Sequence, residues 1–377
     1  GGLAAVVAID SLTGDILYSR MTRDDLTMET RYDDFREISG VRFPFHATVT
    51  SSMPLLNSEE WVQEVQVNAE VSPGEFRISN SDSNASGKPP EDASFAPAYR
   101  FPEGQTFVSI PFEYENSRIF VTARINSTEP VRLLLDSGAG TTTLTSEFAN
   151  RLGLKIHGEI PAKGVSGYQS VGIVQLEEID LGEVALLNQT VAAIDIDEEA
   201  GLSLQGADGI IGYELLNQFP MQIDFTAHRM TLYNPGASPE DFPGESFAIG
   251  FESKVPTVKA VVGKFSGEFL LDLGNSVGII IHNDYAQEIG LDTLVREQNP
   301  HGVVSGVGGR TNIREYIIPE FSLGGFTFRD LAALVMEAGG GMASSESLAG
   351  NIGTPFLDNF LITIDYRRRQ IWLQPLD

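Results

Sequence analysis

Two acidic side chains stand at equivalent points of the sequence, each at the end of an apolar run and just before a glycine. Asp136 lies in the stretch LLLDSGAG, and Asp272 lies in the stretch FLLDLGNS. Such apolar runs are typical of buried strands, so each carboxyl is expected where a strand leaves a core. Gly138 and Gly274 permit a tight turn there and let backbone N–H groups approach the carboxyls closely.

Two such carboxyls can perform general acid–base chemistry if folding brings them together. Like charges a few ångströms apart cannot both ionise, so the pair shares one proton and the two pKa values separate. One carboxylate then takes a proton from an attacking water, and the other donates a proton to the carbonyl oxygen under attack. The alternative for Asp136 and for Asp272 is structural, because an aspartate in a turn also binds nearby N–H groups.

The two acids belong to a repeat that occupies residues 105–377. Each acid is followed at nearly the same spacing by a Gly-Leu pair, which begins at Gly153 in the first copy and at Gly290 in the second. Further along, one constant offset aligns Gly212 with Gly353 and the apolar strand patterns that follow them. Matching order, spacing and apolar pattern indicate a duplicated β-lobe.

Asp-Ser-Gly after an apolar strand, then a glycine-bearing hairpin signal, then Ile-Ile-Gly before a short helix resemble one lobe of a retropepsin-like aspartic protease. Two such lobes in one chain resemble the arrangement of pepsin-type enzymes. The resemblance covers about residues 105–377 and implies a mainly β fold in which two acid-protease lobes form a pseudo-dimer. It implies hydrolysis of peptide bonds in an extended polypeptide without a cofactor. It also implies catalytic roles for Asp136 and Asp272, and places Gly138 and Gly274 in the active-site loops.

In this family the residue after each acid is Thr or Ser, whose hydroxyl holds the opposite lobe. Ser137 fits that role, but Leu273 has no hydroxyl. The resemblance also implies flap hairpins, for which Gly167, Tyr168 and Gly306 are candidates, although Tyr168 is equally compatible with an ordinary edge strand. Because of Leu273, two alternatives to a working peptidase stay open. One is a degenerate second lobe with weak activity, and the other is an inactive module that binds peptides or proteins.

Composition argues against several other classes of function. The 377 residues include 25 basic and 52 acidic ones, and the formal charge of −27 repels nucleic acid and anionic lipid. The chain has no cysteine, which excludes disulfides, thiol catalysis and cysteine-ligated metal. Its five histidines show no metal-ligand spacing, so no metal site is expected. The longest apolar runs are too short to span a bilayer, and the oligomeric state stays open.

The composition changes along the chain predict four segments. Short alternating runs over residues 1–78 predict a small antiparallel β-domain. Residues 79–104 begin with a tract rich in Ser, Asn, Pro and Gly, which predicts a linker. The first protease lobe is expected over residues 105–240 and the second over residues 241–377.

The N-terminal segment also weakly resembles the β-sheet of bacterial lipoprotein-carrier-like proteins, through a Thr-Gly turn and a Gly-Val-x-Phe-Pro entry. This resemblance keeps a third function open, lipid handling in a bacterial cell envelope. The other interpretation is a domain that packs against the protease and orients it. The sequence opens GGLAAVV without an initiator Met, so we expect that the natural N-terminus is missing and that any signal peptide or lipid anchor would be missing with it. The resemblance to lipoprotein-carrier-like proteins implies a location in the periplasm or at the cell surface.

Overall fold

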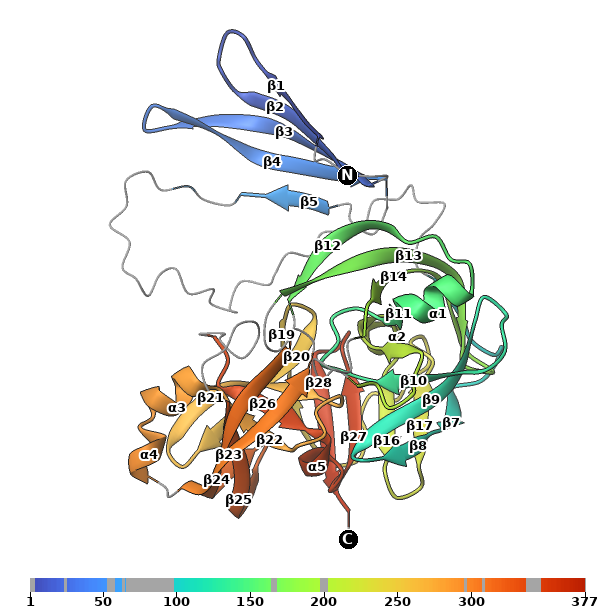
Figure 1. Ribbon diagram of the computed structural model, residues 1–377, viewed down its shortest axis with the longest axis vertical. Coiled ribbons are helices and arrows are strands. Elements are labelled where there is room, and N and C mark those ends of the chain that lie inside the picture. Colours follow the sequence, from blue (N-terminus) through green and yellow to red (C-terminus); the bar gives the residue numbers. More distant parts are fainter. Residues whose placement is uncertain are drawn as a thin grey trace. The chain divides into compact units, whose positions relative to one another are not determined.

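Figure 1 shows a computed structural model of the chain, which consists mainly of β-strands, as the sequence predicts. The structure describes residues 4–23, 26–52, 58–62, 65, 98–163, 168–196, 203–294, 297–306, 309–336 and 347–376. The chain divides into two compact units, one formed by residues 1–96 with 156–159 and the other by residues 97–155 with 160–377. Within these described ranges, every helix is too short or too polar to cross a membrane.

The first unit contains the antiparallel sheet expected at the N-terminal end. Its strands pair in chain order: β1 (Ala4–Ile9), β2 (Ile16–Arg23), β3 (Leu26–Ile38), β4 (Val41–Ser51) and β5 (Ser58–Trp61). The turn between β1 and β2 is stabilised by Asp10, whose Oδ1 accepts hydrogen bonds from the N–H groups of Leu12 and Thr13. Gly14 then adopts a φ of 79°, which glycine reaches without strain.

The second unit contains two lobes, and the first lobe is a nine-stranded sheet. In hydrogen-bonding order its strands are β12 (His157–Lys163), β13 (Tyr168–Asp180), β14 (Ala185–Ile194), β11 (Thr143–Thr145), β15 (Gly209–Ile211), β10 (Val131–Leu135), β9 (Arg118–Ile125) and β8 (Glu113–Glu115), with β6 (Ala98–Arg100) beside β14. An additional pairing of β13 with β9 curls the sheet back on itself. Two short helices belong to this lobe, α1 (Ser146–Arg151) and α2 (Tyr213–Gln218).

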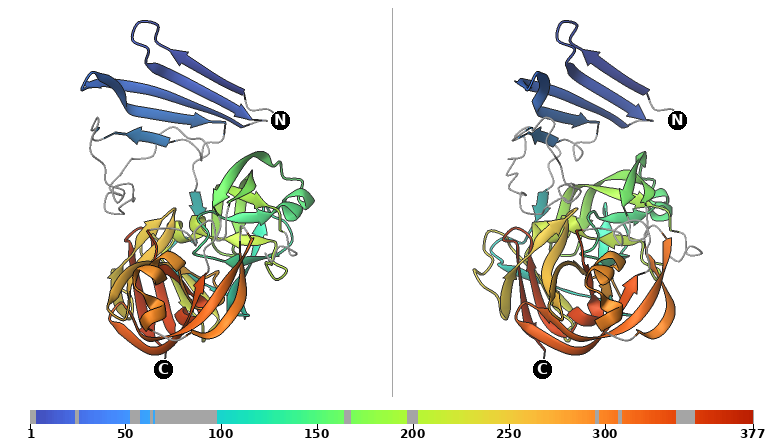
Figure 2. Two further views of the ribbon diagram at one scale, coloured as in Figure 1. Left: turned by 60° about the vertical axis from the view of Figure 1, so that its left-hand side comes forward. Right: turned by 90° about the vertical axis from the view of Figure 1, so that its left-hand side faces the viewer.

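The second lobe is an eight-stranded sheet with the same pattern of connections. Its order is β19 (Gly250–Glu252), β20 (Val255–Val262), β21 (Phe265–Asp272), β26 (Gly350–Gly353), β22 (Ile279–Ile281), β25 (Phe326–Met336), β24 (Gly309–Leu323) and β23 (Glu297–Gly306). Its helices are α3 (Asn283–Glu288), α4 (Leu291–Leu294) and α5 (Thr354–Leu357). Figure 2 shows both lobes from two further directions, the first mainly green to yellow and the second mainly orange to red. The structure therefore confirms the two repeated β-lobes.

The strand that leads to each acid is held between neighbours in the same way in both lobes. β10 runs parallel to β15, with Leu134 beside Ile210, and β21 runs parallel to β26, with Leu270 beside Asn351. Strands with neighbours on both sides and covered faces are apolar along their whole length, which explains the unbroken leucine runs. Leu133 and others in these runs are fully buried, so the acids that follow leave a rigid support.

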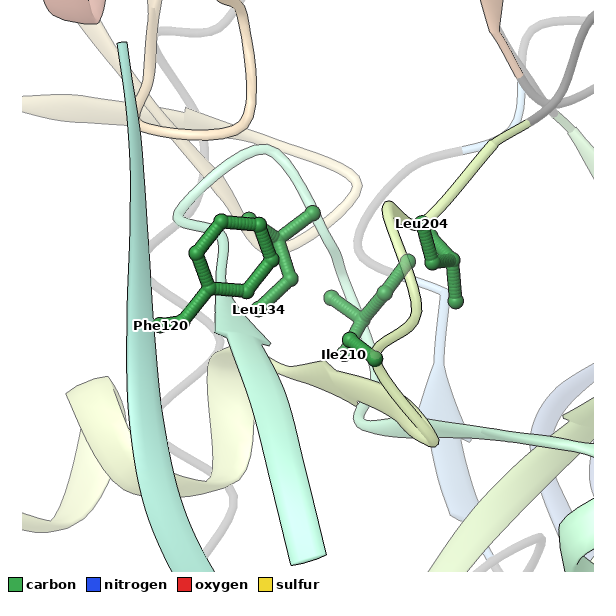
Figure 3. Packing of buried hydrophobic residues seen from close by; sticks show 5 residues of the cluster. Phe120, Leu134, Leu204 and Ile210 are labelled. Atoms are coloured by element: carbon green, nitrogen blue, oxygen red, sulfur yellow. The ribbon is translucent and has the colours of Figure 1, made fainter. Parts of the chain in front are cut away.

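An apolar cluster beside β10 makes this support rigid in the first lobe. Figure 3 shows Phe120 of β9, Leu134 of β10 and Ile210 of β15 together with Leu204 from the segment that precedes β15. All four side chains are buried, and Leu134 lies two residues before Asp136. The packing therefore determines where the chain turns out of the sheet.

A third sheet joins the two lobes, which the sequence did not predict. Its order is β18 (Glu245–Ala248), β28 (Gln370–Pro375), β27 (Phe360–Asp365), β16 (Met221–Asp224), β17 (Arg229–Tyr233) and β7 (Phe107–Pro111). At its centre Gln222 of β16 pairs with Thr363 of β27, and Gln222 Nε2 donates to Thr363 Oγ1 at 3.1 Å. These two residues are equivalent in the repeat, so a local two-fold axis passes between them.

One expected boundary differs from the structure. The predicted linker, residues 79–104, is described only from residue 98 onward, and there Ala98–Arg100 form β6 instead of a free connection. Because β11 pairs only with the far end of β14, the backbone groups of Ala185–Leu187 are left for β6. The composition of residues 98–100 cannot predict this strand, because the unpaired backbone groups that it binds belong to a strand far away in the sequence. The other domain limits stay predictions.

Candidate active site

Asp136 leaves the end of β10 in a tight turn. Its N–H donates to Ile211 O at 3.0 Å, which continues the pairing of β10 with β15 by one residue. Its Oδ1 accepts a hydrogen bond from the Gly138 N–H at 2.7 Å. The turn therefore bends the backbone round the carboxyl and supplies it with a donor.

Asp272 lies at the end of β21 in an equivalent turn with more donors. Its Oδ1 accepts from the N–H groups of Gly274 at 2.9 Å and Asn275 at 3.0 Å. Its Oδ2 accepts from Asn351 Nδ2 at 2.6 Å. Asn351 belongs to β26, the strand that runs parallel to β21.

The two turns pack against each other, and the two carboxyls meet between the lobes. The side chains of Asp136 and Asp272 lie within hydrogen-bonding reach of one another. A Cβ atom at Gly138 would lie 2.6 Å from Cγ of Asp272, and one at Gly274 would overlap the carboxyl of Asp136. Each glycine is therefore required because the acid of the opposite lobe occupies the space that a side chain needs. The structure brings together four of the residues that the sequence singled out.

The electrostatics of the pair follow from burial and like charge. Asp136 keeps some accessible surface, but its carboxyl lies deep among protein atoms. Burial raises the pKa of Asp136 well above its ordinary value, and the charge of Asp272 raises that pKa further. The N–H groups of Gly138 and Gly274 act in the opposite direction but do not cancel these effects. The arrangement keeps a proton on Asp136 at a pH where isolated aspartates have lost theirs.

Ser137 forms the cross-lobe contact that the sequence suggested. Its side chain is buried, and its Oγ donates to Leu271 O at 2.8 Å and accepts from the Leu273 N–H at 3.0 Å. Leu273 is also fully buried and offers no hydroxyl in return. Instead, Thr354 Oγ1 donates to Leu273 O at 2.8 Å from within the second lobe. The contact between the lobes is therefore asymmetric at these positions.

Two asparagines near Asp272 escaped the sequence interpretation. Asn351 donates to the Asp272 carboxyl, and Asn275 Nδ2 donates to Asn351 Oδ1 at 2.7 Å. A signal for them exists in the repeat, because Asn351 replaces the first-lobe Ile210 and Asn275 replaces Ala139. Each change substitutes an amide for an apolar side chain beside an acid.

Two further groups face the carboxyl pair without any signal in the sequence. The guanidinium of Arg118 is partly buried and interacts with Asp136 and Asp272. Burial lowers the pKa of Arg118, and the charges of the two acids act in the opposite direction. The buried hydroxyl of Tyr366 also interacts with both acids, and burial raises the pKa of Tyr366 well above its ordinary value. Neither the Tyr366 hydroxyl nor Arg118 Nε has a hydrogen-bond partner in the described part of the chain.

The expected flap positions lie in two long hairpins. Tyr168 begins β13, which follows β12, and Gly306 ends β23, where it pairs with Gly309 of β24. Gly167 lies outside the described residues. The assignment of these hairpins as flaps stays a prediction. Across the ranges described above, no three His, Asp or Glu side chains gather closely enough to hold a metal ion.

Comparisons with known proteins agree with the repeat. Residues 121–215 and 258–356 match a sequence family described as "Aspartyl protease", and the two matches together cover more than half of the chain. Among solved structures, the aspartic proteinase from Irpex lacteus matches with a TM-score of 0.46 and 14% sequence identity, over 72% of this chain and 98% of that chain. A comparison with curated protein sequences finds no significant match.

Proposed function

The chain belongs to the aspartyl protease family, and we propose that it is an aspartic endopeptidase whose catalytic residues are Asp136 and Asp272. The observation that carries this proposal is the meeting of the two carboxyls, one from each lobe, within hydrogen-bonding reach. A structural turn aspartate needs only its own backbone N–H groups, and nothing in that role calls for a second buried acid opposite.

The chemistry follows from the shared proton. The ionised carboxyl takes a proton from a water molecule as the water oxygen attacks the carbon of the scissile amide. The protonated carboxyl gives its proton to the carbonyl oxygen and so neutralises the charge that develops there. Because burial raises the pKa of Asp136, the singly protonated pair persists above the ordinary range of an aspartate.

We propose that the substrate is a polypeptide in extended conformation. The hairpins β12–β13 and β23–β24 would pair with its main chain in the manner of strand addition, with Tyr168 and Gly306 at the turn ends of the hairpins. The formal charge of −27 argues against nucleic acid as a partner. No step of the reaction requires a cofactor.

The test is cleavage of a denatured protein by the purified chain over a pH series, with sensitivity to pepstatin as a second readout. Asp136→Asn and Asp272→Asn should each lower kcat/KM by about a thousandfold or more, because either change removes the shared proton chemistry. Asp284→Asn is the matched control, because Asp284 is an exposed acid in α3. Wild-type protein that cleaves nothing at any pH would remove the peptidase from consideration.

A second candidate is an inactive peptide-binding module, and Leu273 is the observation in its favour. The missing hydroxyl leaves Ser137 as the side chain that clasps the opposite loop at these positions. Binding of unfolded polypeptide by wild type and Asp136→Asn with equal affinity, together with the absence of cleavage, would support this candidate.

We also propose that the protein acts outside the cytoplasm of a bacterial cell, in the periplasm or at the surface. The support is the likeness of residues 1–78 to lipoprotein-carrier-like sheets. Fractionation of the native host with an antibody against the protease lobes tests this location, and recovery in the cytoplasm alone would contradict it.

A further inference from the structure

The loops that carry the two acids share one backbone hydrogen bond to the carboxyl but differ in their other donors. In both loops the second residue after the acid donates its N–H to Oδ1, from Gly138 to Asp136 and from Gly274 to Asp272. Only Asp272 has a side-chain amide at the equivalent neighbouring positions, since Asn351 donates to its Oδ2 at 2.6 Å. The repeat therefore departs from symmetry at the point where the two carboxyls must take different roles.

The position of Asn351 is an apolar one in the other lobe. Its equivalent is Ile210, which Figure 3 shows packed with Phe120 and Leu134. Asn351 itself is only 9% exposed. Burying an amide is unfavourable unless hydrogen bonds replace those to water, so this residue needs a compensating partner. Its compensation is the carboxyl of Asp272.

Asn275 determines which way the Asn351 amide points. The N–H of Val277 donates to Asn275 Oδ1 at 2.9 Å, and because a backbone N–H can only donate, this oxygen is identified. Asn275 Nδ2 then faces Asn351 Oδ1 at 2.7 Å and Gly278 O at 2.9 Å. Asn351 consequently turns its Nδ2 toward Asp272. Ala139, the counterpart of Asn275, cannot form such a chain.

The donors around Asp272 suit an ionised carboxyl, which only accepts hydrogen bonds. Oδ1 receives the N–H groups of Gly274 and Asn275, and Oδ2 receives the Asn351 amide. Hydrogen bonds from N–H donors to a charged carboxylate are roughly twice as strong as bonds between neutral groups. Among the described residues, Asp136 has fewer donors, since the Gly138 N–H is the one that its own loop supplies. Burial and the charge of Asp272 raise the pKa of Asp136.

Two other charged or titratable groups face both members of the pair. Arg118 of β9 and Tyr366, which follows β27, each interact with both acids and more strongly with Asp136, so neither group favours ionisation of Asp272 over Asp136. A positive charge that acts on both carboxyls favours ionisation of either one. Within the ranges that the structure describes, the Asn351 amide is the side chain that donates a hydrogen bond to one acid of the pair alone.

We propose that Asn351, oriented by Asn275, is a positioning residue that makes Asp272 the ionised member and Asp136 the protonated member of the pair. For catalysis this assignment rests on the proposed peptidase function. Asp272 then takes the proton of the attacking water while the water oxygen bonds to the carbonyl carbon. The carbonyl π electrons move to the oxygen, which takes the proton of Asp136.

The second half of the reaction restores the same charges. The intermediate carries two hydroxyls on the former carbonyl carbon, with Asp272 protonated and Asp136 ionised. Asp136 takes a proton from one hydroxyl as the C=O bond re-forms and the C–N bond breaks. Asp272 gives its proton to the leaving nitrogen, so Asp272 is again ionised and Asp136 is again protonated.

Thermal unfolding of the full chain tests the charge assignment without any need for activity. Asn351→Ile introduces the side chain that the first lobe carries. The melting temperature should fall further below that of wild type as pH rises through the acid range, by about 3 °C or more between the extremes. That widening should persist in an Asp136→Asn background and vanish in an Asp272→Asn background. A difference that is constant with pH, or that still widens in Asp272→Asn, would overturn the proposal.

The pH profile of kcat/KM provides the catalytic readout. In Asn351→Ile the acid limb should move upward by about 1–2 pH units while the alkaline limb stays in place, since only the ionised form of Asp272 loses a donor. Gln222→Leu is the control, because it removes a different amide from the contact between the lobes. A profile that is lowered equally at every pH would show a merely structural role for Asn351. If wild type is inactive throughout, the peptidase proposal fails and the unfolding comparison still decides the charge assignment.

Discussion

Ser137 of the first lobe and Leu273 of the second are joined by a buried hydrogen bond, in which the Leu273 N–H donates to Ser137 Oγ at 3.0 Å. The same hydroxyl donates to Leu271 O at 2.8 Å. One side chain thus holds the backbone on both sides of Asp272. The reverse contact is missing because Leu273 has no hydroxyl, so the alignment of the two acids depends on Ser137 more than it would in a symmetric pair.

Removal of this hydroxyl should therefore be costly. Ser137→Ala leaves a buried N–H and a buried carbonyl without their partner, which costs about 1–3 kcal/mol of unfolding free energy. Urea unfolding and kcat/KM should both fall relative to wild type. Ser322→Ala is the control, since the Ser322 hydroxyl makes an exposed contact with Thr327. A Ser137→Ala protein as stable and as active as wild type would show that these two hydrogen bonds do not align the acids.

A methyl group at Gly274 should separate the acids. The new Cβ would overlap the Asp136 carboxyl, so the loop or the acid must shift. Displacement of a reacting group by about 1 Å can lower a rate by about a hundredfold, and kcat in Gly274→Ala should fall by at least that factor. Gly236→Ala should change little, because its nearest neighbour would be Asn234 Oδ1 at 3.6 Å. Unchanged kcat in Gly274→Ala would mean that the two turns are not packed as described.

The raised pKa of Asp136 predicts a pH dependence of stability. The folded state holds the Asp136 proton more tightly than the unfolded chain does. This contribution to the unfolding free energy is complete below the ordinary aspartate pKa of about 3.9 and is lost as pH rises through the raised value. Asp136→Asn lacks this loss, so its stability relative to wild type should improve over that range, by about 1.4 kcal/mol for each unit of pKa difference. Urea unfolding at a series of pH values measures the difference, which a flat curve would contradict.

Replacement of Arg118 should move the whole pH profile. Its guanidinium interacts with both acids and favours their ionised forms. In Arg118→Met the acid and alkaline limbs of kcat/KM should both shift upward, by about one pH unit. Arg118→Lys keeps the charge and should shift the limbs less. A shift of one limb alone in Arg118→Met would show that the charge does not act on both carboxyls.

The acid pair and the duplicated lobes were accessible from the sequence because their signals are local. An apolar run ends in Asp136, and a similar run ends in Asp272. Each run predicts a buried strand, and the glycine that follows predicts a turn. The repeat then links the two turns, since equivalent positions in a pseudo-dimer come together about one axis. The same comparison of the two turns shows that Ser137 has a hydroxyl and that Leu273 has none.

The remaining groups depend on distant contacts. Arg118 and Tyr366 lie far from each other in the sequence but both interact with the acids, and no pattern in the neighbouring residues predicts this. β6 pairs with backbone groups of β14, and the local pattern of residues 98–100 does not predict this pairing. Asn351 is different, because its departure from the Ile-Ile-Gly of the first lobe is visible in the repeat itself.

The central pairing of Gln222 with Thr363 has a consequence for either half made alone. Strand β16 would lose its partner β27, and the edge left bare would be complementary to another copy of itself. A first lobe produced by itself should therefore assemble as a homodimer in which Ser137 of each copy contacts the acid-bearing turn of the other. A homodimer of the second lobe would lack both contacts, because Leu273 has no hydroxyl. In the joined chain, the hydroxyl of one half holds the acid-bearing turn of the other, and Leu273 returns no such contact.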